Sequence, residues 1–308
     1  MPRPSLISTT LVLTFAVITL GAYVRLSNAG LGCPDWPGCY GRLIVPEHVR
    51  VESAVAHARA WIEMVHRYAA GVLGLSIAVL AWLAFRGGRG RRFAVALTVL
   101  VIFQALLGMW TVTLRLQPVI VMGHLLGGLA LLSLLWLWRL SASRHVPNSP
   151  LRGAAAAAVL VVVSQIALGG WTSANYAAVA CADFPTCQGQ WWPDADFDEG
   201  FSLPAAVAGS WEGGGHTGAG RTAIHLAHRL GAVAAVLVVG LFATGLLRAG
   251  GPLRRAGLVL GIALLGQFFL GAANVLLSFP LSLAVAHTAG AALLLLAVLW
   301  SARSVLTR

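Results

Sequence analysis

Residues 153–173 read GAAAAAVLVVVSQIALGGWTS and contain no charged side chain. A stretch of about 20 mostly apolar residues is long enough to cross the hydrocarbon core of a bilayer as a helix. Further stretches of this kind occur on both sides of it. The eight predicted spans are roughly 6–26, 61–85, 93–114, 119–138, 153–173, 222–247, 257–277 and 281–301. The chain is therefore predicted to be an all-α integral membrane protein.

The composition of the whole chain agrees with this prediction. Of the 308 residues, 58% are hydrophobic and only 10% are charged, and the mean hydropathy is +0.81. These values exclude a soluble globular domain. A net charge of +11 would suggest a nucleic-acid partner in a soluble protein, but arginine in membrane proteins mostly marks cytoplasmic loops. We therefore expect a lipid bilayer and no nucleic acid as the surroundings of the chain.

Charged residues segregate between the predicted loops and indicate a topology. Arginines gather at the termini and in the even-numbered connections, at positions 3, 86, 89, 91, 92, 139, 144, 152, 248, 254, 255, 303 and 308. All acidic residues lie in or beside the two long loops of the other face. The positive-inside rule then predicts cytoplasmic termini and outward-facing long loops. We expect residues 6–26 to be a retained helix and not a signal peptide, because no small-residue cleavage site follows them.

An internal repeat divides the chain into two halves, residues 1–140 and 153–308. The repeated features are Cys33-Pro-Asp-Trp-Pro-Gly-Cys39 with Cys181-Ala-Asp-Phe-Pro-Thr-Cys187, His66-Arg67 with His228-Arg229, Gln104-x3-Gly108 with Gln267-x3-Gly271, and His124 with His287. Four spans in each half give both halves the same orientation in the membrane. The predicted architecture is thus two pseudo-symmetric four-helix bundles.

Each half is predicted to carry two histidines near the outer ends of its second and fourth helices, His66 and His124 in the first half and His228 and His287 in the second. Two neutral imidazoles from facing helices can bind a heme iron between them, each at about 2 Å. The alternatives are packing histidines or zinc ligands, for which the closed Cys/His spacing is absent. The sequence therefore predicts two candidate heme sites.

Two further residue types accompany these histidines. Arg67 and Arg229 follow the second-helix histidines directly, and each either extends toward the membrane interface or pairs with a heme propionate. Gln104, Gln165 and Gln267 each precede a glycine by four positions. That spacing favours close helix approach with the amide hydrogen-bonded across the bundle, and a cofactor contact is the alternative. We expect His48, His57, His145 and His216 to lie in loops, with no role assigned.

The two halves differ at one informative position. Glu63 lies three residues before His66, on the same helical face, whereas His225 takes the equivalent place before His228. A carboxylate beside only one site favours proton-coupled chemistry in the first half and a resident redox cofactor in the second. The alternative is that Glu63 is solvated at the interface or paired with Arg67.

The four cysteines lie in the predicted outward loops. In an oxidising compartment, a disulfide within each Cys-x5-Cys segment is the default expectation. Cross-pairing between the loops remains open, because connectivity is not encoded in spacing. A short disulfide loop can also be reducible, so a redox role for Cys33 and Cys39 is admissible beside a structural one.

These motifs together resemble the heme A synthase family. The residues that carry the resemblance are Cys33-Pro-Asp-Trp-Pro-Gly-Cys39, Glu63-Met-Val-His66-Arg67, Gly123-His124, His228-Arg229 and Ala286-His287-Thr288-Ala289-Gly290. The resemblance implies oxidation of a methyl group of heme O to the formyl group of heme A, which serves terminal oxidases. It implies substrate heme at His66 and His124, essential Glu63, and a heme b cofactor between His228 and His287. It also implicates the first cysteine pair in activity.

The resemblance further implies a multi-pass protein of the bacterial plasma membrane. A heme O synthase, an electron-transfer partner and a second copy of the chain are the partners it brings into consideration. Two other functions compete with this one. A diheme electron-transfer protein of the quinol-linked cytochrome b type would not need Glu63, and a parallel-repeat transporter would not need the intramembrane His-Arg motifs.

Overall fold

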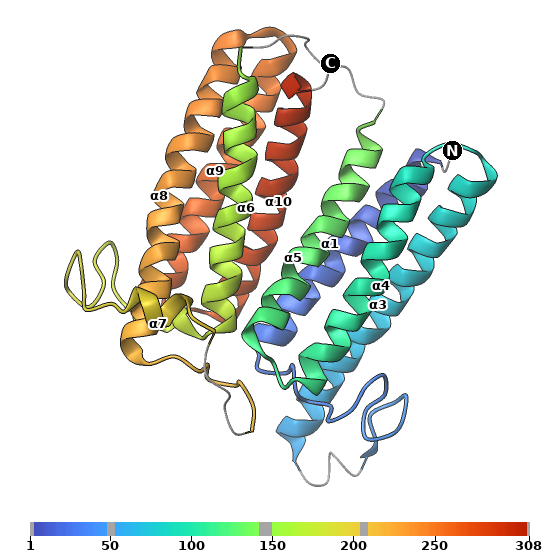
Figure 1. The fold of residues 1–308 in the computed structure, drawn as a ribbon, viewed down its shortest axis with the longest axis vertical. Helices are drawn as coiled ribbons and strands as arrows, with labels where there is room; N and C mark the ends of the chain where they lie inside the picture. Colours follow the sequence, from blue (N-terminus) through green and yellow to red (C-terminus); the bar gives the residue numbers. More distant parts are fainter. Residues whose placement is uncertain (1–2, 48–52, 142–149, 204–208, 307–308) are drawn as a thin grey trace. The chain divides into compact units, whose positions relative to one another are not determined.

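The computed structural model describes residues 3–47, 53–141, 150–203 and 209–306. In these ranges, eight helices are long and apolar enough to cross a membrane (Figure 1). They are α1 (Pro4–Leu26), α3 (Ala54–Arg86), α4 (Arg91–Thr113), α5 (Pro118–Arg139), α6 (Arg152–Ala174), α8 (Gly218–Ala249), α9 (Gly251–Leu276) and α10 (Leu281–Leu306). The same ranges contain no strand beyond isolated bridges. The predicted all-α membrane class with eight spans is confirmed.

Helices α3 and α8 are the longest, at 33 and 32 residues. At 1.5 Å per residue each is about 50 Å long, well beyond the roughly 30 Å of a hydrocarbon core. Both begin earlier than hydropathy predicts, because Ser53 and Thr217 cap them by accepting from the backbone N–H groups of Ala56 and Gly220. The expectation that His57 lies in a loop is therefore wrong, since this residue belongs to the added turns of α3.

The chain divides into two compact units. Unit 1 comprises Met1–Arg139 with Val207–Gly213, and unit 2 comprises Leu140–Ala206 with Gly214–Arg308. In unit 1, α1 and α4 each pack against both α3 and α5, and in unit 2, α6 and α9 each pack against both α8 and α10. The helices of a unit thus form a closed ring with the same order of neighbours in both. The common orientation of the two halves stays a prediction.

The fourth helix of each unit, α5 or α10, is packed unevenly along its length. In unit 1 the core includes Ile77, Leu97 and Leu135, in the halves of their helices nearest the connection between α3 and α4. Toward the other end, α5 has no fully buried residue at any of positions 120–128, and α10 of unit 2 has none at 283–291. A helix packed on its inward side buries a residue every turn. The inward sides of these turns are therefore only loosely filled.

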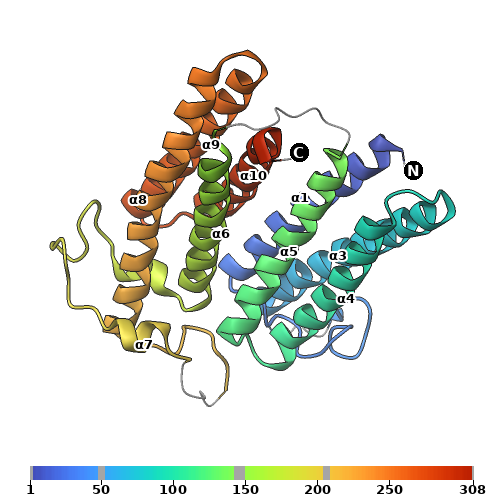
Figure 2. The same cartoon turned by 45° about the horizontal axis from the view of Figure 1, so that its top comes forward.

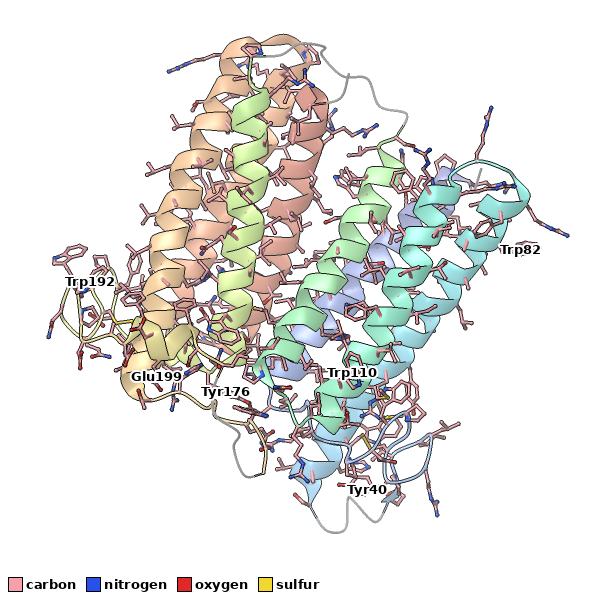
Figure 3. The ribbon with its side chains drawn as sticks, viewed as in Figure 1. Tyr40, Trp82, Trp110, Tyr176, Trp192 and Glu199 are labelled. Atoms are coloured by element: carbon pink, nitrogen blue, oxygen red, sulfur yellow. A yellow bond between two sulfur atoms is a disulfide. The ribbon has the colours of Figure 1, made fainter. Side chains whose placement is uncertain are left out.

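The long connection between α6 and α8 contains short helices, η1 (Ala177–Ala180) and α7 (Phe197–Phe201). Helix α7 packs against α8 near its N-terminal end (Figure 2). The indole N–H of Trp171 at the end of α6 donates to the carbonyl of Gly200, at 2.9 Å. Figure 3 labels Glu199 on α7 and Trp192 in the segment before it. The connection therefore contacts both α6 and α8.

Candidate functional site

A disulfide closes each cysteine loop. Cys33 and Cys39 are bonded, with their Cα atoms 4.9 Å apart, and Cys181 and Cys187 are bonded, with Cα atoms 4.6 Å apart. The first disulfide is buried against Ala60 and Met64 of α3. Both bonds join cysteines of one loop, so the default connectivity is the one that the structure has, and cross-pairing does not occur.

The aspartate of each Cys-x-Asp segment shapes its own loop. Asp35 accepts from the backbone N–H groups of Tyr40 and Gly41, at 2.6 and 2.7 Å. Asp183 accepts from the hydroxyl of Thr186 and from the N–H groups of Gln188 and Gly189. The Thr186 hydroxyl and these amides lower the pKa of Asp183 to about 2. The sequence repeat contained this signal, although we assigned neither aspartate a role.

The two arginines that follow the helix histidines fasten the loops to the helices. Arg67 donates to the backbone carbonyls of Asp35, Pro37 and Gly38. Arg229 donates to three carbonyls of the second loop, at 2.6 to 3.0 Å: those of Thr186, Cys181 and Asp183. Each guanidinium therefore places a disulfide loop beside the turn that carries a candidate iron ligand. A propionate contact for either arginine stays a prediction.

Glu63 is buried, with only 4% of its surface exposed. Its Oε2 accepts from the backbone N–H of Cys33 at 2.9 Å, and its Oε1 forms an ion pair with Arg67. The carboxylate thus connects the disulfide loop to the helix face that carries His66. A solvated interfacial position for Glu63 is excluded by this burial, whereas the alternative of a pair with Arg67 is realised.

In unit 1, His66 on α3 and His124 on α5 come from helices that both pack against α1 and α4. Their ring centroids are 6.5 Å apart, with the ring planes at 85°. An iron bound to one nitrogen of each ring needs roughly 6 Å between ring centres, given metal–nitrogen bonds of about 2 Å. The separation therefore fits a metal between two imidazoles.

Glycines on neighbouring helices make room for all four rings. A Cβ on Gly21 would lie 2.9 Å from Cε1 of His66, and a Cβ on Gly108 would lie 3.4 Å from Cε1 of His124. In unit 2, Gly169 and Gly271 stand in the same relation to His228 and His287, each at 3.1 Å. Imidazole rings that pack against glycines beside loosely filled helix turns are compatible with the planar heme that the sequence predicts.

The rings of unit 2 also have polar partners. The amide Nε2 of Gln165 lies 3.0 Å from Nδ1 of His228, and that of Gln267 lies 3.3 Å from Nδ1 of His287. Both amides also donate to the carbonyl of the same histidine. Their predicted hydrogen bonding across the bundle is confirmed, whereas the Nε2 of Gln104 has no partner among the described residues.

The remaining histidines have structural surroundings. Trp61 donates its indole N–H to Nε2 of His57, at 3.2 Å. His216 lies in the connection before α8, as expected, and burial lowers its pKa although Glu199 is 3.9 Å away. His48 and His145 lie outside the described residues. Within those residues, no three or more His, Cys, Asp or Glu side chains form a group that could hold a metal ion.

A membrane-embedded helical protein with a facing pair of imidazoles in a loosely filled bundle falls in the class of polytopic proteins suited to bind heme iron. Residues 5–299 match the model of the cytochrome oxidase assembly protein family COX15-CtaA. The chain therefore belongs to this family, in agreement with the resemblance found in its motifs.

Individual relatives extend over nearly the whole chain. The heme A synthase of Shewanella oneidensis is 41% identical over 310 residues, covering 94% of this chain and 93% of that protein. The heme A synthase of Rhizorhabdus wittichii is 27% identical, over 97% of this chain and 94% of that protein. Heme A synthase 2 of Acidiphilium cryptum is 28% identical, over 94% and 89% respectively.

Proposed function

We propose that this protein is a heme A synthase, an oxidoreductase that converts a methyl group of heme O into the formyl group of heme A. The observation that carries the proposal is the pair of imidazoles 6.5 Å apart in unit 1, in a chain 41% identical to a heme A synthase. Heme O is a hydrophobic molecule already dissolved in lipid, so a membrane-spanning bundle is a suitable place to receive it.

The two units have different roles in this proposal. Unit 1 binds the substrate heme through His66 and His124, and unit 2 binds heme b through His228 and His287. Among the described residues, Glu63 is the single buried carboxylate beside a histidine pair, and this supports the division. Heme b supplies one-electron transfer when bound. Each pair comes from two helices of one bundle, which suits a planar ligand between them.

Glu63 is the acid-base group in this proposal. Conversion of a methyl to a formyl group is an oxidation that breaks two C–H bonds, and in this proposal its electrons pass to the electron-transfer partner. A carboxylate can accept a proton that is released. The N–H of Cys33 and the guanidinium of Arg67 orient this carboxylate. The ion pair also offsets part of the cost of a buried charge. Arg67 and Arg229 remain candidate partners for the heme propionates.

The arrangement in the cell follows from charge and family. We propose cytoplasmic termini and outward-facing disulfide loops in a bacterial plasma membrane, on the segregation of arginine from acidic residues. Labelling of single cysteines introduced at positions 86–92 tests this sidedness. Reaction with an impermeant reagent only after the cells are opened is expected, and reaction in intact cells contradicts the topology. A heme O synthase and an electron-transfer protein are the proposed partners.

Identification of the pigments in the purified protein tests the function directly. Extraction is expected to yield heme b together with heme O or heme A. Heme b alone would support the diheme electron-transfer function, which the matching histidine pairs of the two units also suit. A protein without heme would support a transporter.

A further inference from the structure

The glutamines beside the candidate ligands belong to a reciprocal packing arrangement. In unit 2, Gly169 leaves room for the ring of His228, and Gly231, three residues after that histidine, leaves room for the side chain of Gln165. Gln165 in turn lies four residues before Gly169 on α6. A glutamine and a histidine on adjacent helices thus each occupy space left by a glycine of the other helix. We call this arrangement a Gln–His crossing.

The same crossing occurs between α9 and α10. The ring of His287 lies over Gly271, and the side chain of Gln267 lies over Gly290. The amide of Gln267 is 3.3 Å from both ring nitrogens of His287 and donates to its carbonyl at 3.1 Å. Both candidate ligands of unit 2 are therefore held by an amide as well as by packing.

Unit 1 contains one crossing that packs alike but lacks the hydrogen bond. His124 lies over Gly108, and Gln104 lies over Gly127. However, the Nδ1 atom of His124 and the Nε2 atom of Gln104 are buried without a hydrogen-bond partner in the part of the chain that the structure describes.

The fourth crossing is incomplete. Gly21 leaves room for the ring of His66, but Val17 stands four residues before Gly21, and Ala69 stands three residues after His66. No glutamine therefore meets this ring, and its Nδ1 atom is buried without a partner among the described residues. Across the four candidate ligands, fixation by an amide decreases from His228 and His287, through His124, to His66.

A hydrogen bond to the second ring nitrogen fixes the orientation of a metal-bound histidine and raises its basicity, and its loss typically costs 10- to 100-fold in metal affinity. When Nε2 binds iron, Nδ1 carries a proton and needs an acceptor. A glutamine amide offers a donor and an acceptor at one end. The Oε1 atoms of Gln165 and Gln267 are buried without a partner in the described residues. Half a turn of the amide offers this acceptor to the Nδ1–H group, in exchange for the hydrogen bond that Nε2 donates to the carbonyl of the same histidine.

We propose that Gln165 and Gln267 are positioning residues that retain the heme of unit 2, and that Val17 and Ala69 leave His66 without such a partner, so that the heme of unit 1 exchanges. This inference rests on the proposed function, because it assigns a resident heme to unit 2 and a substrate heme to unit 1. A substrate must leave as product, whereas a cofactor must stay. The difference in ligand fixation matches these two requirements.

The first experiment alters the complete crossings in the purified, heme-loaded protein. Gln267→Leu is expected to speed the transfer of heme b to excess apo-globin by about 10- to 100-fold and to raise its midpoint potential, because the histidine becomes a weaker electron donor. Gln267→Glu keeps a stronger acceptor and is expected to retain heme b with a lowered midpoint potential. Gln104→Leu is the matched control and should leave both properties of heme b unchanged.

The second experiment builds the missing crossing at His66. Val17→Gln combined with Ala69→Gly is expected to slow the transfer of heme O to apo-globin by about 10-fold or more and to reduce the rate of heme A release. Ala69→Gly alone supplies the space without the amide and should leave heme O transfer as in the wild type. Should Gln267→Leu fail to insert, Gln267→Glu and this double variant still test the inference.

Unchanged heme b retention and potential in both Gln267 variants would overturn the role of the glutamines. Wild-type heme O transfer in the double variant would overturn the role of Val17 and Ala69. A wild-type protein that contains no heme b with heme O or heme A would instead contradict the proposed function itself, so the two failures are distinguishable.

Discussion

Glu63 in α3 and His225 in α8 occupy equivalent positions, three residues before a candidate iron ligand, but their surroundings differ. Glu63 accepts from the backbone N–H of Cys33 and pairs with Arg67. His225 accepts from Nε of Arg229 at 3.3 Å, and its Nδ1 atom is buried without a partner among the described residues. In both units the arginine also binds carbonyls of the cysteine loop.

This comparison indicates whether Glu63 serves the structure of the disulfide loop or the reaction. Unit 2 builds a disulfide loop, fastened by Arg229 to the same helix turn, without a carboxylate at this position. A disulfide loop of this kind can therefore form without a carboxylate at that position. A buried carboxylate costs free energy even when it is paired, so its presence in unit 1 favours a role in the reaction.

The largest expected effect comes from the histidines of unit 2 that we propose as ligands of heme b. His228→Ala or His287→Ala is expected to abolish the six-coordinate, low-spin heme b spectrum and with it the activity, because one axial nitrogen is lost. His66→Ala and His124→Ala should keep that spectrum and lose heme O binding. Optical and electron paramagnetic resonance spectra of the four variants measure this. Unchanged spectra in both unit 2 variants would rule out the assignment of ligands.

Glu63→Gln tests the difference between Glu63 of unit 1 and His225 of unit 2. The amide oxygen can still accept from Cys33, but the basic carboxylate is gone, so heme A production should fall by about 10²- to 10⁴-fold while heme b and heme O remain bound. Pigment analysis of membranes measures both quantities. His225→Gln is the matched change in unit 2 and should have a much smaller effect. Wild-type turnover by Glu63→Gln would return Glu63 to a purely structural pair with Arg67.

The disulfides offer a second way to compare the units. Each closes a loop with a sequence separation of 6, so the chain-entropy model gives each about 2 kcal/mol of stability. Replacing either pair by serine should lower the unfolding temperature to a similar extent. We predict that only the Cys33/Cys39 variant loses heme A synthesis beyond this destabilisation. Equal losses of activity and stability in both variants would remove the distinction.

The smallest expected effect concerns the acid stability of the second loop. The folded pKa of Asp183, about 2, lies below the ordinary aspartate value of about 4. Its contribution is therefore complete above about pH 4 and is lost as the pH falls toward 2. The protection factors of the Gln188 and Gly189 amides, relative to exchange of an unfolded peptide at the same pH, should be constant above about pH 4 and fall as the pH approaches 2. Asp183→Asn should lower these protection factors already above pH 4, and wild-type protection in this variant would contradict the assignment.

The spans were predictable because the bilayer imposes a length and an apolar composition on each of them. The first turns of α3 and α8 were not predictable, because they contain polar residues such as His57, and capping by Ser53 and Thr217 determines where the helices begin. Hydropathy likewise placed the start of α9 near residue 257, whereas Pro252 at the first turn lets the helix begin at Gly251.

The candidate ligands were predictable from the repeat, and so was the difference at Glu63. The partners of Arg67 and Arg229 were not, because backbone carbonyls have no signature in a sequence. The glutamines illustrate an intermediate case. Their spacing from glycine was visible, but only the structure reveals that the glycine admits an imidazole and that the amide meets it.

The Gln–His crossings also limit the order in which mutations can accumulate. A side chain added at Gly231 or Gly290 meets the glutamine that occupies that space, so the glutamine must be replaced by a smaller residue first. In the opposite direction, by analogy with the three existing crossings, we expect that Ala69 has to become glycine before Val17 can become glutamine. When a crossing is lost, the glutamine therefore changes before the glycine, and when one is built, the glycine appears before the glutamine. At His66, the single variant Ala69→Gly is accordingly expected to be tolerated better than Val17→Gln. A mutant library that changes positions 17 and 69 one at a time would therefore yield folded variants with Ala69→Gly but none with Val17→Gln.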